Sequence, residues 1–442
     1  MIRSIKAKHF MNSAFKEFSL YDNVRSIPSL LDGMKPSQRK ALYGASLRGE
    51  SASEIQVERL AASIAAETDY HHGTASMEST IVNMAANYTG SNNMNLFVPS
   101  GQFGSRLTKE AAASRYIFTQ LSDNYRKLFK KEDECILEHN IVDGQKIEPK
   151  NYMPILPLIL VNGAQGTGTG YASYIMCYNP NDIKNSILNV LDKKTLAAFS
   201  LDPWYNGFTG TITRDKISGQ VTIRGRLEVV NTTIIHITEL PVGVYLDQYK
   251  DHLTKLEDDG FIKDFEDRST EDGFDFVVTC PRTTTSLPLE KLYEKFKLIS
   301  RDTENYTLWN EKGTLEKYTS VEDVISRFTG WRLEGYEKRR QKLMVDTQAL
   351  IETLSERLRF VLFYLDNSDE FRNKKKADLV QMLIDNEFVN YDKLLQMPIW
   401  SLTRDKIEEL KKQIDNEKSY LKTLQKDTAD KMYRRELEAF TF

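Results

Sequence analysis

Cysteine is scarce in this chain. Only Cys135, Cys177 and Cys280 occur among 442 residues, and they are widely spaced and odd in number. Disulfide-stapled domains and zinc sites require cysteines in pairs, or together with histidines at fixed spacings. We therefore expect neither a disulfide framework nor a zinc site, and we expect the protein to work in a reducing compartment.

Long apolar runs are also missing. The longest candidate, around residues 155–161, is far shorter than the roughly 18 residues of a membrane-spanning helix. The N-terminal sequence MIRSIKAKHF is basic, but no apolar segment follows it, as a secretory signal would require. The sequence thus predicts no membrane association, and the expected location is the cytoplasm.

The composition is that of a folded, multidomain protein. A hydrophobic content of 40% and a charged content of 28% are typical of globular proteins, and 442 residues suggest two to four domains. Residues 1–131 hold 17 Lys/Arg and 11 Asp/Glu, whereas the remainder holds 43 and 52. The basic N-terminal part is consistent with nucleic-acid binding, although ordinary variation in surface charge explains these counts equally well.

Hydrophobic periodicity predicts short helices in the first part of the chain, over 38–47, 54–67 and 76–87. Successive short helices suit a helix-turn-helix or winged-helix unit, and a helical bundle without a DNA role is at least as compatible with the pattern. From about residue 150, the apolar run 155–161 predicts a buried strand. Alternating segments at 209–213, 220–226 and 232–239 predict further strands of a mixed α/β domain that extends to about residue 330.

The last hundred residues predict two long helices joined by a compact insert at about 366–402. The apolar positions of the first helix, over 334–362, are Leu350, Leu354, Leu358 and Val361. Those of the second helix are Ile407, Leu410, Ile414, Leu421 and Leu424. This spacing favours an antiparallel coiled-coil arm with a globular tip.

The pair Arg115 and Tyr116 is the first candidate for chemistry. A phenol has a pKa of about 10, so a base or a metal must remove its proton before the oxygen can attack. A neighbouring arginine offers a forked cation suited to a phosphate. Because the chain has 21 tyrosines, any one of them, considered alone, is far more often a packing residue than a nucleophile.

Two further motifs bear on function. His71 and His72 lack acidic or cysteine partners at zinc-site spacing, and they lie in the same basic portion as Lys35, Arg39 and Lys40. A phosphate contact is therefore the functional alternative to ordinary hydrogen bonding within the fold. The glycines of NGAQGTGTG (162–170) match neither a dinucleotide fingerprint nor a phosphate loop, so we reject nucleotide binding and expect tight strand packing or close approach to DNA.

Six segments together carry a resemblance to a known family. They are RSIPSLLDGMKPSQRKAL (25–42), YHHG (70–73), TGSNNMNLFVPSGQFGSRL (89–107), AAASRYIFTQLS (111–122), EPKNYMPILPLILVNGAQGTGTGYAS (148–173) and PWYNGFTGTI (203–212). In wording, order and spacing they resemble the breakage–reunion region of type IIA DNA topoisomerases, over nearly the whole chain. The sequences of these segments resemble the eukaryotic enzymes more than bacterial gyrase. The short, separate chain is similar to the branch found in T-even-type bacteriophages, which would place it in a bacterial cytoplasm.

The resemblance implies roles for individual residues. Tyr116 matches the nucleophile, Arg115 the neighbour that stabilises the transition state, and His72 a histidine at the scissile phosphate. Positions that the resemblance, or their place in the basic region, assigns to DNA contacts are Arg25, Lys35, Arg39, Lys40, His71, Gln102, Ser105, Arg106 and Thr167. Thr167 stands where the family commonly has an isoleucine that wedges between base pairs, and its hydroxyl makes it a weaker wedge.

The resemblance also implies cofactors and partners. The chain has neither the clustered Asp-x-Asp motif of the metal-binding fold nor an ATPase signature, so Mg²⁺ and ATP are expected to be bound by one or more partner subunits. The other expected partners are double-stranded DNA and a second copy of this chain. No metal site is expected on the chain itself.

These inferences define a multidomain α/β architecture. Residues 1–147 are expected to form a winged-helix cleavage domain, 148–330 an α/β tower-like domain, and 331–442 a coiled-coil arm whose tip is a dimer gate. The expected function is ATP-dependent double-strand cleavage, strand passage, relaxation and decatenation. The alternatives are a tyrosine recombinase or nicking enzyme, and a non-enzymatic, dimeric architectural DNA-binding protein.

Overall fold

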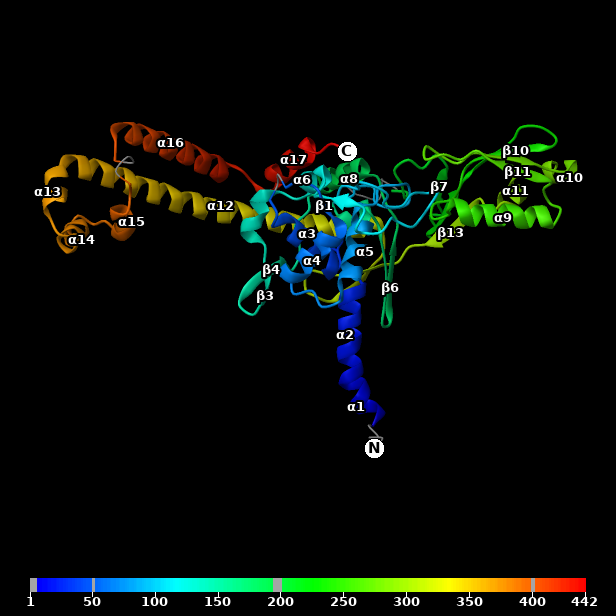
Figure 1. The fold of residues 1–442 in the computed structure, drawn as a ribbon, viewed down its shortest axis with the longest axis horizontal. Coiled ribbons are helices and arrows are strands. Elements are labelled where there is room, and N and C mark those ends of the chain that lie inside the picture. The colour runs from blue at the N-terminus through cyan, green and yellow to red at the C-terminus, as the bar shows by residue number, and fades with distance from the viewer. Residues whose placement is uncertain (1–5, 50–51, 194–200, 399–401) are drawn as a thin grey trace. The chain divides into compact units, whose positions relative to one another are not determined.

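The computed structural model describes residues 6–49, 52–193, 201–398 and 402–442. The chain divides into two compact units (Figure 1). The first comprises the residues up to Arg332 together with 436–442, and the second comprises Leu333–Arg435. The boundary falls inside the 46-residue helix α12 (Val321–Asp366). Each unit has hydrophobic clusters of its own.

Five helices open the first unit. They are α1 (Ala7–Asn12), α2 (Ala14–Ser26), α3 (Pro36–Ser46), α4 (Val57–Glu67) and α5 (Thr74–Ala85). Helix α3 begins at Pro36, where a missing N–H costs nothing. Leu42, Leu60, Ile64 and Ile81 are fully buried in the core that these helices share. The three helices predicted from periodicity are thus confirmed, except that Ile55 and Gln56 form a strand.

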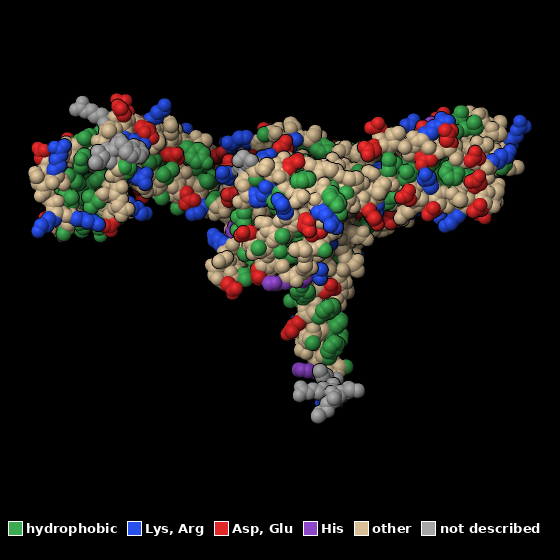
Figure 2. All heavy atoms as spheres, in the orientation of Figure 1, with side chains coloured by type: hydrophobic (Ala, Val, Ile, Leu, Met, Phe, Trp, Pro, Cys, Tyr) green, Lys and Arg blue, Asp and Glu red, His purple; other side chains and the backbone are tan. Residues whose placement is uncertain are grey.

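Helix α2 exposes apolar side chains on more than one side. Phe18, Leu20 and Val24 are 59%, 56% and 43% exposed, and Figure 2 shows hydrophobic side chains along this helix. Leu20 and Val24 lie on one side of the helix, and Phe18 lies about 200° from Leu20 around its axis. Exposed apolar side chains of this kind are typical of a surface that another protein segment covers.

Short strands connect the helices to the segment that carries Tyr116. Strand β1 (Ile55–Gln56) pairs antiparallel with β2 (Phe118–Thr119). Isolated bridges join Phe97 to Leu121 and Ser100 to Phe118, also antiparallel. The segment after Tyr116 therefore lies between two neighbouring strand segments.

The chain between β2 and the larger sheets is built from small elements. They are α6 (Asp123–Leu128), the 3₁₀ helix η1 (Lys131–Ile136), β3 (His139–Val142), β4 (Gln145–Pro149), α7 (Leu158–Val161), β5 (Ala164–Gly168), β6 (Tyr171–Ile175) and α8 (Pro180–Leu191). The predicted buried strand over 155–161 is wrong, because its second half is the helical turn α7. Pro157 precedes that turn, and a short, wholly buried apolar run has no periodicity that distinguishes a strand from a helix.

Two antiparallel sheets follow. A four-stranded sheet has the order β11-β12-β10-β9, and a three-stranded sheet the order β13-β8-β7. The bounds are β7 (Thr211–Arg214), β8 (Gln220–Arg224), β9 (Arg226–Val229), β10 (Ile234–Glu239), β11 (Asp264–Asp267), β12 (Phe276–Thr279) and β13 (Ile299–Thr303). Helices α9 (Leu246–Asp258), α10 (Arg282–Thr285) and α11 (Leu289–Lys295) and the hairpin β14 (Tyr306–Trp309) and β15 (Leu315–Tyr318) complete this part. The three strands predicted from alternation are confirmed as β7, β8 and β10.

In the second unit, α12 packs against α16 (Arg404–Lys426). Leu354 and Val361 contact Leu410 and Ile414, while Arg340 donates a hydrogen bond to the Leu424 carbonyl at 3.4 Å, so the two helices run antiparallel. Helices α13 (Ser368–Asn373), α14 (Lys376–Asp385) and α15 (Tyr391–Leu395) form the insert, and α17 (Ala429–Ala439) follows α16.

The predicted apolar face of α12 is wrong at one position. Leu350 is 44% exposed, whereas the next residue, Ile351, is buried. Ile351, Leu354 and Leu358 are three and four positions apart, so they share the helix face that packs on α16, and Leu350 lies beside that face.

The hairpin β5–β6 packs closely on α2. A Cβ added to Gly166 would collide with the Ser26 carbonyl oxygen. We expect Gly166→Ala to destabilise the first unit by about 1–3 kcal/mol, because backbone cannot make room as a flexible side chain can. Thermal unfolding of the full chain measures this. The matched change Gly330→Ala, in helix α12 with open space around it, should instead raise the midpoint slightly, since alanine favours helix.

Candidate functional site

Tyr116 is the most accessible large aromatic residue of its segment. Its side chain is 71% exposed, whereas the next residue, Ile117, is 1% exposed, and Thr119 is fully buried. Tyr116 ends a turn in which its N–H donates to the Ala113 carbonyl at 2.8 Å, and from there into β2 successive residues alternate between solvent and the core. The buried neighbours therefore anchor the segment, and Tyr116 points outward.

The residues around Tyr116, 111–119, form what we call the tyrosine loop, and this loop covers the N-terminus of α4. The first N–H groups of a helix have no acceptor within it. Here the Val57 N–H donates to the Ile117 carbonyl at 3.1 Å, and the Glu58 N–H donates to the Ser114 carbonyl at 3.3 Å. The loop thus satisfies the helix end, and the helix end holds the loop.

Side chains fix the same loop from both sides. The Gln56 amide donates to the Arg115 carbonyl at 3.0 Å, and the Ser114 hydroxyl donates to Glu78 Oε2 at 2.8 Å. The Arg115 guanidinium lies 5.6 Å from the centre of the Tyr116 ring. A candidate nucleophile and a cation of a kind suited to a phosphate are therefore presented together on a held backbone.

A second group of predicted site residues lines one cavity of about 630 Å³, which we call the α2–α3 cavity. The predicted site residues among its lining are Arg25, Lys35, Lys40 and His72. Lys35 Nζ donates to the Gln165 carbonyl at 2.9 Å, which links α3 to the β5–β6 hairpin. Residues from three distant parts of the sequence thus meet at this cavity.

His72 is held at the rim of this cavity by an interaction that the sequence did not reveal. Its Nε2 shares a hydrogen bond of 2.8 Å with the Tyr21 hydroxyl, and the Tyr70 ring meets its ring edge-on, with the centroids 5.3 Å apart. Tyr21 is 51 positions away in the sequence, so no local pattern could have assigned it to the site.

Partial burial, the positive charge of Arg25 and the adjacent His71 lower the pKa of His72 below its ordinary value of 6.5. The neutral imidazole therefore predominates at pH 7. We expect the histidine titration followed by NMR to show this residue, identified by comparison with His72→Gln, with a midpoint below 6.5. Arg25→Gln should move the midpoint upward, because it removes a nearby positive charge, whereas the remote change Arg282→Gln should leave it in place.

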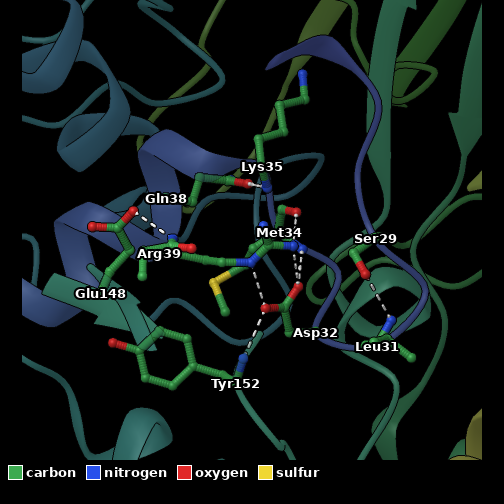
Figure 3. A network of polar contacts seen from close by, with 10 residues as sticks. Ser29, Leu31, Asp32, Met34, Lys35, Gln38, Arg39, Glu148 and Tyr152 are labelled. Atoms are coloured by element: carbon green, nitrogen blue, oxygen red, sulfur yellow. Dashed lines mark hydrogen bonds and ion pairs between the residues drawn. The ribbon is translucent and has the colours of Figure 1, made fainter. Parts of the chain in front are cut away.

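Two of the predicted DNA contacts, Arg39 and Lys40, have strong partners inside the fold, and Figure 3 shows the contacts of Arg39 with Asp32. Arg39 Nε lies 2.7 Å from Asp32 Oδ2, and Asp32 is fully buried. Lys40 Nζ lies 3.0 Å from Glu148 Oε2 and also donates to the Thr68 carbonyl at 2.5 Å. Both cations thus connect parts of the core, and any contact of theirs with DNA remains a prediction.

Asp32 was not among the predicted site residues, although it organises this network. Besides Arg39, it accepts hydrogen bonds from the backbone N–H groups of Met34 at 3.1 Å and Tyr152 at 2.9 Å. It stands beside Gly33, whose φ is +69°, in a turn where an added Cβ would meet the backbone of α7. The Asp-Gly pair was the only local signal for this turn.

The remaining predicted residues lie outside the α2–α3 cavity. Arg106 forms an ion pair with Glu239 and donates to the Leu240 carbonyl at 2.8 Å. Gln102 and Ser105 accept hydrogen bonds from backbone N–H groups of their own loop. His71 lies 3.0 Å from Asp69, and Thr167 is exposed on strand β5, opposite Ala172. Their roles remain predictions.

Helix α5 separates the tyrosine loop from the cavity. Ser76 and Thr80 line the cavity, whereas Glu78 binds Ser114 of the tyrosine loop. Successive helix residues are rotated by about 100°, so Glu78 lies about 200° from both. Within one copy of the chain, Tyr116 and the cavity therefore occupy opposite flanks of α5.

Across the described ranges, no group of three or more His, Cys, Asp or Glu side chains could hold a metal ion. Cys135, Cys177 and Cys280 are all unbridged. Of the helices in the described parts of the chain, none is long and apolar enough to cross a membrane.

Comparison with known proteins identifies relatives across the chain. The family model of DNA gyrase/topoisomerase IV, which describes their A-type subunits, matches residues 25–438. DNA topoisomerase 2 of Penicillium chrysogenum is 36% identical over 98% of this chain and 30% of its own length. DNA topoisomerase 2 of Arabidopsis thaliana is also 36% identical, over 97% of this chain and 32% of its own. The chain thus spans about a third of the length of the curated relatives it matches.

A solved structure is similar over almost the whole fold. The crystal structure of the Plasmodium falciparum topoisomerase II DNA-binding, cleavage and re-ligation domain aligns with a TM-score of 0.91 and 34% sequence identity. The alignment covers 97% of this chain and 63% of that chain.

Proposed function

This chain belongs to the family of DNA gyrase/topoisomerase IV A-type subunits, and on that premise we propose that it cleaves and rejoins DNA as part of a type II topoisomerase. The Tyr116 oxygen attacks a backbone phosphate, forms a 5′-phosphotyrosine and displaces the 3′-oxygen as a hydroxyl. The reverse attack by that hydroxyl restores the phosphodiester and releases Tyr116. The energy of the broken bond is kept in the link, so resealing needs no further source of energy.

The observation that carries this proposal is the presentation of Tyr116. Its side chain is 71% exposed on a loop that is hydrogen-bonded to the end of α4, with Arg115 beside it. A held, accessible nucleophile next to a forked cation suits attack on a phosphate, whose negative charge increases in the transition state.

We propose that the α2–α3 cavity holds neighbouring DNA phosphates. Arg25 and Lys35 supply positive charge there, and neutral His72 supplies a ring nitrogen held by Tyr21. Phosphate contacts of this kind position a duplex without reading its sequence. The contacts assigned to Arg39, Lys40, His71, Gln102, Ser105, Arg106 and Thr167 belong to the same proposal.

The metal and nucleotide functions are proposed to reside in protein outside the described residues. Mg²⁺ would assist the transesterification, and ATP turnover would drive passage of a second duplex, giving relaxation and decatenation. The exposed apolar side chains of α2 support a contact with such a partner, since Phe18 and Leu20 are more than half exposed. Assignment of this chain to the medium subunit of a phage enzyme, with its bacterial location, stays a prediction, because the topoisomerase 2 relatives named for this chain are eukaryotic.

Two copies of the chain are proposed to act together, because a duplex has two strands and each copy offers one Tyr116. In this proposal α3, α4 and α5, with the short strands around β2, form the winged-helix unit. The antiparallel helices α12 and α16 form the arm, and the α13–α15 insert forms the dimer gate. The packing of Leu354 against Leu410 and Ile414 supports such an arm.

A covalent-trapping assay tests the proposal. The chain is mixed with supercoiled plasmid, Mg²⁺ and candidate partner subunits, denatured rapidly and digested, and the DNA-linked peptide is identified by mass spectrometry. A 5′-phosphate on Tyr116, together with linear plasmid, is the expected result. An adduct on another tyrosine, or none with any partner, would refute the assignment.

The same assay separates the alternatives. A tyrosine recombinase or nicking enzyme would give protein-linked nicks without a partner or ATP. An architectural DNA-binding protein would give salt-sensitive binding and no covalent product. Adjacency of Arg115 and Tyr116, rather than several separated cations around a distant tyrosine, favours the topoisomerase reaction over the recombinase.

A further inference from the structure

A second cavity, of about 870 Å³, lies beside helices α3 and α4, and Leu60 of α4 is one of its lining residues. It is lined by residues from α3, α4, α6, η1 and the turns near β4, and its apolar walls include Leu60, Leu121, Leu137 and Met153. None of the residues proposed for catalysis or for DNA contact lines it. The volume falls within the range of small-molecule sites in proteins. We call it the aromatic cavity.

Three aromatic residues of the cavity lining, Tyr125, Phe129 and Tyr152, form a continuous row of ring contacts. The Tyr125 and Phe129 ring centres are 5.1 Å apart with tilted planes, and the Phe129 and Tyr152 centres are 5.4 Å apart in an edge-on arrangement. Aromatic rings favour further aromatic partners in stacked or edge-on geometry. The wall is therefore suited to an aromatic ligand rather than an aliphatic one.

One polar atom in this wall points to the kind of ligand. Tyr152 is 6% exposed, and within the described structure its hydroxyl oxygen has no hydrogen-bond partner. Its backbone N–H donates to Asp32 Oδ2 at 2.9 Å, so the backbone that carries this buried side chain is held in place. A buried hydroxyl without a partner is costly, and a ligand that accepts its hydrogen bond removes that cost.

The protonation state of this hydroxyl is defined by its surroundings. Burial, and then the neighbouring Tyr125, Asp32, Glu148 and Tyr43, raise the pKa of Tyr152 well above its ordinary value of 10. It therefore stays protonated over the whole physiological range, and it can donate a hydrogen bond to a carbonyl or a ring nitrogen.

The other lining residues give the cavity a basic rim. Its cations are Arg48, Arg126, Lys130 and Lys131. Its two carboxylates are Asp133, which is already bound to Arg332, and Glu134. The Arg126 side chain is 47% exposed even though it pairs with Asp123. An excess of positive charge beside apolar walls attracts an anionic group at the mouth of the cavity.

We propose that the aromatic cavity binds a small aromatic anion, with a hydrogen-bond acceptor directed at the Tyr152 hydroxyl and a carboxylate, sulfonate or phosphate at the basic rim. This site is separate from the proposed cleavage site. It requires neither DNA nor strand passage, so its failure would leave the proposed topoisomerase function untouched.

The probe is 4-benzoylbenzoate, which combines two aromatic rings, a ketone acceptor, a carboxylate and photochemical reactivity toward C–H bonds. The full chain is irradiated with increasing probe concentration, and the labelled peptides are identified by mass spectrometry. We expect saturable labelling confined to peptides that contain Phe129, Leu137 or Met153. Labelling that does not saturate, or that spreads over the surface, would overturn the proposal.

Matched variants test the two polar contacts. Tyr152→Phe removes only the hydroxyl and should raise the probe concentration at half-saturation about three- to tenfold. The control is Tyr249→Phe, which removes a hydroxyl already bonded to the Phe296 carbonyl and should leave that concentration unchanged. Lys130→Gln should raise the probe concentration at half-saturation about threefold, whereas Lys422→Gln, at an exposed position on α16, should leave it unchanged. Wild-type labelling of both Tyr152→Phe and Lys130→Gln, with unchanged circular dichroism, would refute the site.

Discussion

Tyr116→Phe is expected to abolish covalent attachment of the chain to DNA and to reduce cleavage by a factor on the order of 10⁴ or more, as for other removed nucleophiles. The substitution deletes the attacking oxygen but keeps the ring beside the Arg115 guanidinium. Because the side chain is 71% exposed, we expect the folding stability to change by less than about 0.5 kcal/mol. The measurement is the yield of protein-linked linear plasmid after rapid denaturation of the assembled enzyme.

The control for this change is Tyr420→Phe, which deletes a hydroxyl from another exposed tyrosine, on α16 in the second unit. It should cleave and reseal DNA as the unchanged protein does. If Tyr116→Phe still formed a protein-linked double-strand break, Tyr116 would not be the nucleophile. The family membership would stand, but the cleavage mechanism proposed for this chain would have to be replaced.

Asp133→Asn is expected to lower the free energy of unfolding of the first unit strongly, because it breaks a buried ion pair. Asp133 forms an ion pair with Arg332, whose side chain is completely buried and also donates to the Pro154 carbonyl at 3.1 Å. The substitution removes this counter-charge from a buried guanidinium, which costs about 3–5 kcal/mol. Differential scanning calorimetry of the full chain should show the transition of the first unit shifted downward by several degrees.

The same helix offers a matched control. Arg327 of α12 pairs with Glu311, and the two side chains are 41% and 27% exposed. Because solvent screens this pair, Glu311→Gln should cost no more than about 1 kcal/mol. Equal shifts for the two variants would show that burial does not set the strength of the Asp133–Arg332 pair. The buried ion pair would then not explain how the junction between α12 and η1 is stabilised.

Local sequence patterns determined much of the secondary structure. Apolar residues at helical spacing place Leu60 and Ile64 on one face of α4, and alternation identifies β8 and β10, because these periods follow directly from backbone geometry. The pattern failed for 155–161, where every residue is buried. Without a polar face, a run of this length has no period to read.

The candidate site was only partly accessible to the same reasoning. The adjacency of Arg115 and Tyr116 is a property of the sequence, and the resemblance to a known family assigned both residues a role. The exposure of Tyr116, by contrast, depends on Ile117 filling the core and on α4 accepting the loop at its N-terminus. Those contacts join residues about sixty positions apart, which no periodicity encodes.

Sequence and tertiary structure also determine different aspects of the charge. The sequence by itself determined that the first 131 residues are basic and that the cysteines are too few and too scattered for a disulfide framework. Only the tertiary structure decided which cations face a cavity and which form ion pairs inside the fold. Arg39 is held by buried Asp32, whereas Arg25 and Lys35 line the α2–α3 cavity. A side chain's formal charge is fixed by its chemistry, but its availability to a ligand depends on partners that folding brings from distant parts of the chain.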